Sequence, residues 1–97
     1  MAIRQQIDPN LLPGAGRSDD PRLGHWAQFE DIAQFKSRKP LIGLFGCPDD
    51  AGVLANRGRA GAKQGPSEIR RHFYRMTLPA DAPWDQKLDL LDSGDIY

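Results

Sequence analysis

The sequence predicts an α/β fold with a parallel sheet, because a buried strand, a helix and a second strand follow one another along the chain. A continuous apolar run, LIGLFGC, occupies residues 41–47, an amphipathic segment follows from Gly65, and a second short apolar run lies around residues 88–91. A strand, a helix and a strand in this order form a βαβ unit, in which the helix carries the chain back and the two strands pair in parallel.

The first of these strands is predicted to be the centre of the core. Its apolar run is entered through Pro40 and left through Pro48, and it shows no alternation of apolar and polar side chains. A short run of this kind is typical of a strand buried on both faces of a parallel sheet. We therefore expect residues 41–46 to form the central buried strand, with Cys47 at its end as an inert hydrophobic residue.

The helix that follows has a recognisable start and one apolar face. Gly65 can cap it, Pro66 suits its first turn, and Glu68 places a negative charge near its N-terminus. Large apolar residues recur at intervals of four and three positions, which predicts a stripe that packs on the strand: Ile69, Phe73 and Met76. The arginines of this helix fall largely outside the stripe: Arg70, Arg71 and Arg75.

Upstream of the first strand, the chain is predicted to divide into an irregular arm and the start of the α/β domain. Residues 1–24 are rich in Pro and Gly, which is typical of loops, whereas residues 25–97 contain the periodic segments. Residues 25–35 place Trp26 and Phe29 at helical spacing. We expect a short amphipathic helix there, in which both rings are packing residues.

Charge is segregated along a chain whose formal net charge is zero. Residues 57–75 are strongly basic, whereas residues 77–97 contain five Asp and one Lys. Domains that bind nucleic acid are usually net basic, so this composition argues against a nucleic-acid partner. The basic region overlaps the connection 47–64, and connections as long as this one are usually functional or disordered.

Several kinds of site and location are disfavoured by the pattern. No apolar run approaches the roughly 20 residues that span a bilayer, and the first residues lack the apolar stretch of a secretory signal, so we expect a cytoplasmic protein with no membrane partner. His25 and His72 lie far apart and Cys47 has no CxxC partner, so we expect no metal ligand and no catalytic residue in this chain. After the second strand, Asp92 and Asp95 indicate a turn in which they cap backbone groups, with a cation site as the alternative.

Three further motifs follow one another over residues 41–96. The first strand ends in Gly-x-Pro, which Asp50 and Gly52 follow; a Gly-Ala-x-x-Gly-Pro-x-x-Ile-Arg segment stands at residues 61–70, and an Asp-x-Gly-Asp segment at residues 92–95. In this order and spacing, the motifs resemble the N-terminal part of the ureohydrolases, the family of arginase, agmatinase and formimidoylglutamase. The segments NRGRAGA and GRSDDPRLGHW are most similar to formimidoylglutamases, which act in histidine degradation.

The resemblance implies that residues 25–97 form the N-terminal βαβ portion of a three-layer α/β/α arginase-like domain. The family hydrolyses a guanidino or formimino C–N bond of a small-molecule substrate, using two manganese ions that activate a bridging water. It holds these ions through Gly-Gly-Asp-His, Asp-Ala-His-x-Asp and Ser-x-Asp-x-Asp segments, and none of these occurs in this sequence. We therefore expect the 97-residue chain to bind no manganese and to be inactive by itself, and we expect the whole enzyme to be a homo-oligomer.

Within this resemblance, the basic loop is the candidate substrate-binding segment. A loop that follows the first strand lies at the carboxyl end of the sheet, where α/β sheets bind ligands. Asn56, Arg57 and Arg59 could meet a substrate carboxylate there, since a guanidinium matches a carboxylate well. The alternative is that the two arginines are solvated or pair with Asp49 and Asp50. A second function class is a non-catalytic binding module whose loop 56–63 captures an anionic ligand or an acidic partner.

Overall fold

The computed structural model of the chain describes residues 4–14, 19–79, 81 and 83–97. Its sheet is assembled around one strand, β4 (Asp89–Ile96). The strands β3 (Leu41–Gly46) and β2 (Gln28–Phe29) pair with β4 in parallel, and β1 (Arg4–Gln5) pairs with it in antiparallel fashion. The predicted α/β class with parallel strands is confirmed.

The register of the sheet explains why β4 occupies its centre. β3 pairs along β4 from Leu41 opposite Asp89 to Gly46 opposite Asp95, with one irregularity after Leu44. β2 and β1 are short and pair with the middle and the end of β4, so they share its other edge. The prediction that residues 41–46 form the central strand is wrong, because β3 has one described neighbour whereas β4 has three.

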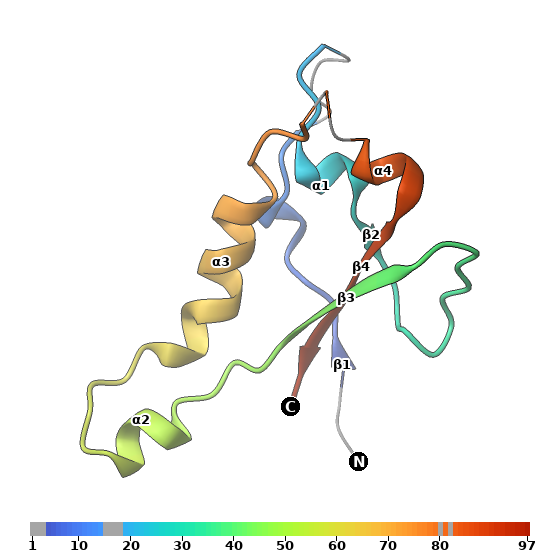
Figure 1. Cartoon of the computed structure of the whole chain (residues 1–97). Coiled ribbons are helices and arrows are strands. Elements are labelled where there is room, and N and C mark those ends of the chain that lie inside the picture. Colours follow the sequence, from blue (N-terminus) through green and yellow to red (C-terminus); the bar gives the residue numbers. More distant parts are fainter. Residues whose placement is uncertain (1–3, 15–18, 80, 82) are drawn as a thin grey trace.

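The helices lie beside this sheet and beyond its ends (Figure 1). They are α1 (Leu23–Trp26), α2 (Ala51–Ala55), α3 (Gly65–Phe73) and α4 (Trp84–Lys87), with short 3₁₀ turns η1 (Pro9–Leu11) and η2 (Ala62–Gln64). In Figure 1, α3 runs beside β3 and β4, and α2 stands beyond its N-terminal end. Thus the connection between β3 and α3 contains two helical turns of its own. None of the helices in the described ranges is long and apolar enough to cross a membrane.

The predicted helix over residues 25–35 is wrong beyond its first two residues. α1 ends at Trp26, Ala27 is extended, and Gln28 and Phe29 then pair with β4. The side chains account for this exchange of helix for strand: the Trp26 indole donates to the Leu88 carbonyl at 3.1 Å, and the Phe29 ring meets the Tyr74 ring edge-on at 5.4 Å. Strand pairing and these contacts override the helical spacing of the apolar residues.

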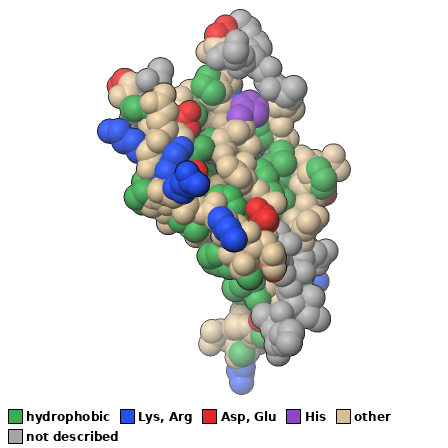
Figure 2. Space-filling view, turned by 90° about the vertical axis from the view of Figure 1, so that its right-hand side faces the viewer, with side chains coloured by type: hydrophobic (Ala, Val, Ile, Leu, Met, Phe, Trp, Pro, Cys, Tyr) green, Lys and Arg blue, Asp and Glu red, His purple; other side chains and the backbone are tan. Residues whose placement is uncertain are grey.

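The two apolar surfaces that were expected to meet are largely exposed, although Phe73 of the helix is half-buried. The side chains of β3 include Ile42, which is 48% exposed, and the stripe of α3 includes Ile69, which is 65% exposed. α3 instead turns Arg70 and Tyr74 toward the sheet, and both are buried. The prediction of a strand buried on both faces, covered by the stripe of α3, is therefore wrong. Hydrophobic side chains reach the surface in several places on the face shown in Figure 2.

The core lies between β4, α3 and segments from the N-terminal part of the chain. Its buried apolar residues are Leu11, Leu23, Tyr74, Leu78, Leu90 and Leu91. The N-terminal segment is attached to α3 as well, because the guanidinium of Arg75 donates to the Leu11 carbonyl at 2.7 Å. A backbone hydrogen bond from Leu23 to the Met76 carbonyl, 2.9 Å, joins α1 to the segment that follows α3.

Truncating Leu91 should destabilise the chain far more than truncating the stripe of α3. Leu91 is 0% exposed and lies where β4 pairs with both β2 and β3. We expect Leu91→Ala to lower the free energy of unfolding by about 2–5 kcal/mol, as other buried Leu→Ala changes do. The exposed Ile69→Ala is the control and should cost less than about 0.5 kcal/mol in the same urea titration. Equal costs would contradict this assignment of the core.

Candidate functional site

The carboxyl ends of the two long parallel strands meet at one edge of the sheet. Gly46 is the last residue of β3, and it pairs with Asp95 near the end of β4. The chain then leaves β3 through Cys47 into the basic loop and returns at Gly65, the first residue of α3. Since open α/β sheets bind ligands at the carboxyl ends of their strands, this edge is the candidate functional site.

A buried ion pair lies directly beneath this edge. Arg70, which is 2% exposed, reaches from α3 to Asp92 on β4 and binds its carboxylate with two donors. The distances are 2.7 Å from Nε to Oδ2 and 3.0 Å from Nη2 to Oδ1. This bidentate geometry is the strongest form of Arg–carboxylate contact, and it fixes the rotation of α3 against β4.

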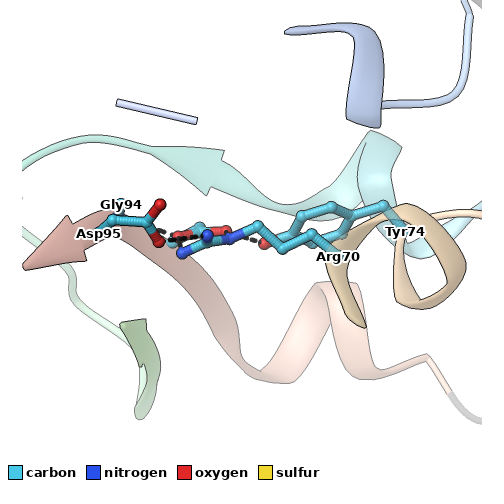
Figure 3. A network of polar contacts seen from close by, with 5 residues as sticks. Arg70, Tyr74, Gly94 and Asp95 are labelled. Carbon is cyan, nitrogen blue, oxygen red and sulfur yellow. Dashed lines mark hydrogen bonds and ion pairs between the residues drawn. The ribbon is translucent and has the colours of Figure 1, made fainter. Parts of the chain in front are cut away.

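Two more side chains complete the network (Figure 3). The remaining nitrogen of the guanidinium, Nη1, donates to Asp95 Oδ1 at 2.5 Å, and the hydroxyl of Tyr74 donates to Asp92 Oδ2. Gly46 must be a glycine at this place, because a Cβ there would collide with the Asp95 carboxylate and lie 2.9 Å from Pro66 Cβ. The network therefore holds α3, β3 and β4 together at the carboxyl edge.

The prediction of a turn around Asp92 and Asp95 is wrong, because β4 continues through both residues, but the predicted capping of a backbone group is confirmed for Asp92. Gly94 adopts a positive φ of 82°, and its N–H donates to Asp92 Oδ1 at 2.9 Å, so the strand is locally irregular without ending. The carboxylates of Asp92 and Asp95 bind the guanidinium of Arg70. This guanidinium lies where the alternative prediction placed a metal cation. The sequence showed the segregation of charge, but sequence reasoning missed that the basic and acidic segments pair with each other through Arg70 and its two aspartates.

Burial and hydrogen bonding shift the pKa values of this network. Burial lowers the pKa of the Arg70 guanidinium, but the hydrogen bonds to Asp92 and Asp95 outweigh it, so that pKa is raised. The pKa of Tyr74 is raised well above its ordinary value of 10.0, first by burial and then by the hydrogen bond to Asp92. Arg70 and Tyr74 thus keep their protons throughout the physiological range.

Above the network, Asp50 organises the basic loop. Its Oδ1 accepts the backbone N–H groups of Gly61 and Lys63, at 3.0 and 2.9 Å. These hydrogen bonds, that from Lys63 first, lower the pKa of Asp50 below its usual 3.8. Asp49 Oδ1 accepts the N–H of Ala51 at 2.5 Å. Both aspartates therefore bind backbone groups of the loop.

The three predicted substrate-binding residues lie together in the turn that follows α2. Asn56 is the C-terminal cap of α2, and Arg57 and Arg59 come next on the same turn; all three are exposed. Arg57 has a φ of 60°, a left-handed conformation that is uncommon for a residue other than glycine. Gly58 lies so close to the helix that a Cβ there would be 2.7 Å from Val53 Cγ1.

An apolar groove of about 310 Å³ lies between the end of β3 and the first turns of α3. Leu44, Phe45 and Cys47 line it on the strand side, and Ala62, Pro66 and Ile69 line it on the other. The loop that carries the arginines thus stands beside an apolar hollow.

The described residues do not fit a two-manganese centre. They contain no group of three or more His, Cys, Asp or Glu side chains placed to hold a metal ion. The two carboxylates at the sheet edge, Asp92 and Asp95, both bind Arg70, whose positive charge opposes a cation. The two carboxylates at this edge therefore serve the buried pairing with Arg70.

Comparison with known proteins finds similarity to formimidoylglutamases of Staphylococcus aureus. The enzyme of strain bovine RF122 / ET3-1 is 35% identical over 99 residues, which cover 96% of this chain and 30% of the relative. The enzymes of strains JH9 and Newman match with the same identity and coverage. The chain spans about 30% of the length of these curated relatives. No family model and no solved structure matches it.

Removing the buried arginine should cost far more than removing its neighbour in the sequence. Arg70→Ala would leave Asp92 buried without its cation, so we expect a loss of about 3–5 kcal/mol in the free energy of unfolding. Arg71 is the control, because it makes only an exposed pair with Glu68 at 3.6 Å. Arg71→Ala should cost less than about 1 kcal/mol. Chemical denaturation measures both, and similar losses would refute the structural role of Arg70.

Tyr74 should make the chain lose stability in alkaline solution. Its pKa is raised in the folded state, so its contribution is complete below pH 10, the ordinary value, and is lost as pH rises further. Above pH 10 the unfolded chain releases the phenolic proton and the folded chain retains it, which lowers the free energy of unfolding by up to about 1.4 kcal/mol per pH unit. Urea titrations from pH 8 to 11.5 would show this slope. Tyr74→Phe should lack it, and an equal slope in this variant would contradict the assignment.

Proposed function

We propose that this chain is the N-terminal part of a ureohydrolase that hydrolyses the formimino C–N bond of formimidoylglutamate. The observation that carries the proposal is the similarity to formimidoylglutamases, which extends over 96% of the chain and is not confined to one motif. The parallel pairing of β3 with β4 and the motifs at its carboxyl edge agree with it. In the complete enzyme, this portion would belong to a three-layer α/β/α fold.

The part of the reaction assigned to this chain is recognition of the substrate's carboxylates. Formimidoylglutamate carries two of them, and a guanidinium binds a carboxylate through paired, charge-assisted hydrogen bonds. Arg57 and Arg59 are exposed on a turn at the carboxyl side of the sheet, and Asn56 adds an amide beside them. These residues would hold and orient the substrate without taking part in bond cleavage.

The backbone of Arg57 supports this role. A left-handed residue other than glycine costs roughly 1–2 kcal/mol, and the position after a helix is one where glycine is usual. Residues held in such conformations cluster at binding sites, where the cost is retained for function. The φ of 60° at Arg57 therefore favours a side chain kept for its guanidinium.

Two manganese ions would supply the hydrolytic water in the complete enzyme, where paired metals generate such a nucleophile. The residues described here do not hold them, so the ions would be bound elsewhere in the enzyme. We also propose a cytoplasmic location and a homo-oligomer, on the resemblance to the family alone.

The activity can be tested with the protein encoded by the complete reading frame that contains residues 1–97. The purified protein, loaded with manganese, should release formamide from formimidoylglutamate, with arginine and agmatine as comparison substrates. Formamide release with no urea from the other two would support the proposal. Absence of turnover on all three would refute it, and binding of glutamate without turnover would favour a non-catalytic anion-binding module.

Replacing Arg57 by glycine should separate stability from recognition. Arg57→Gly removes the unfavourable left-handed conformation, so we expect the free energy of unfolding to rise by about 1 kcal/mol. The same change removes a charged hydrogen-bonding group worth about 1.5–3 kcal/mol, so KM should rise roughly 10- to 150-fold with kcat unchanged. Inhibition by glutamate should weaken by the same factor.

Arg71→Ala is the matched control for loss of a positive charge from the same basic region. Arg71 lies on α3, outside the turn that bears Arg57. Its side chain is exposed and pairs with Glu68. Its KM should stay within about twofold of the wild-type value, as for a surface charge remote from the ligand. An unchanged KM in Arg57→Gly, or an equal rise of KM in both variants, would contradict the binding role. Arg57 would then be a solvent-exposed side chain, as in the alternative interpretation.

A further inference from the structure

We propose that Asp50 is a positioning residue that holds the turn bearing Asn56, Arg57 and Arg59 in one conformation. The effect of Asp50 on catalysis rests on the proposed function. The hydrogen bonds by which Asp50 holds the loop, here called the clasp, do not. Asp50 precedes α2, and its side chain reaches across to the far end of the loop. One carboxylate oxygen accepts two backbone N–H groups there, from Gly61 at 3.0 Å and from Lys63 at 2.9 Å.

The same residue also holds the near end of the loop. Its backbone carbonyl accepts the N–H of Leu54 at 2.9 Å, which is the first hydrogen bond of α2. The segment between residues 51 and 60 therefore begins and ends on Asp50. Within it, the N–H of Arg57 donates to the Leu54 carbonyl at 3.0 Å, and the N–H of Gly58 to the Val53 carbonyl at 2.8 Å. The conformation of the arginine turn is thus connected to Asp50 through a short series of hydrogen bonds.

Packing contributes little to the order of this loop. α2 contains no buried residue, and residues 54–64 are exposed throughout. A segment without buried apolar contacts opens easily, so its hydrogen bonds decide how much of the time it is ordered. A loop already ordered in its binding conformation avoids the entropy cost of ordering several side chains when the ligand arrives. Asp50 would supply this order from outside the contact with substrate.

Asp50→Ala, Asp50→Asn and Asp49→Ala together test the clasp in the 97-residue chain. The measurement is amide hydrogen exchange at Gly61 and Lys63 by NMR. Loss of both acceptor contacts in Asp50→Ala should speed exchange by about tenfold, whereas the amide oxygen in Asp50→Asn can accept the same hydrogen bonds and should keep the rates within about threefold. Asp49→Ala is the control, because Asp49 bonds Ala51 and should leave Gly61 and Lys63 unchanged. Equal exchange in Asp50→Ala and the control would overturn the clasp.

The positioning role is tested by the kinetics of the complete protein on formimidoylglutamate. A residue that orders the loop before binding should raise KM in Asp50→Ala by about five- to tenfold with little change in kcat, and Asp50→Asn should restore it. Faster amide exchange with an unchanged KM would overturn the positioning role and leave a purely structural clasp. Absence of turnover by the wild-type protein would refute the proposed function, while the exchange rates would still decide the clasp.

Discussion

The bidentate ion pair between Arg70 and Asp92 is the interaction on which the rest of the structure depends. It joins α3, the longest of the described helices, to the strand that pairs with every other described strand. Tyr74 donates to the same carboxylate, and its ring meets Phe29 from β2. Because α3 is attached through this polar face, Ile69 and Met76 of the apolar stripe are exposed and Phe73 is half-buried. Leaving a buried carboxylate without its cation is costly, so the pair specifies one rotation of the helix against the sheet.

The same network supports the candidate site from below. Asp95 binds the guanidinium from the carboxyl end of β4, and the absence of a side chain at Gly46 lets β3 approach it. The basic loop departs from this point and is closed again by Asp50 before α3 begins. Two groups of charged residues therefore lie at one edge of the sheet, one buried and one exposed. The buried group is fully paired and holds the fold together, whereas the exposed group presents guanidinium groups that can meet an anion.

Sequence reasoning located the region of this site but not its internal contacts. The loop was recognised from its glycines and its basic residues, and Asn56, Arg57 and Arg59 do lie on one exposed turn. Arg70 was grouped with Arg71 and Arg75 as an arginine outside the apolar stripe, and arginines are mostly exposed. Its burial depends on two aspartates more than twenty residues away, Asp92 and Asp95, and helical periodicity contains no information about that distance. The role of Asp50 was hidden for the same reason, since the backbone N–H groups that donate to its carboxylate lie at the far end of the loop.

The sequence by itself determined the features that rest on local physics. The strand at residues 41–46 and the helix from Gly65 follow from apolar runs, Pro and Gly positions and helical spacing, and their order determines parallel pairing. The tertiary structure alone decided that β4 is central, that residues 28–29 leave the predicted helix to pair with it, and that α3 buries Arg70 in place of Ile69. Each of these outcomes depends on a hydrogen bond or ion pair between residues far apart in the chain. Such contacts stabilise the fold by more than local secondary-structure propensities do, because these propensities are worth less than about 1 kcal/mol per residue.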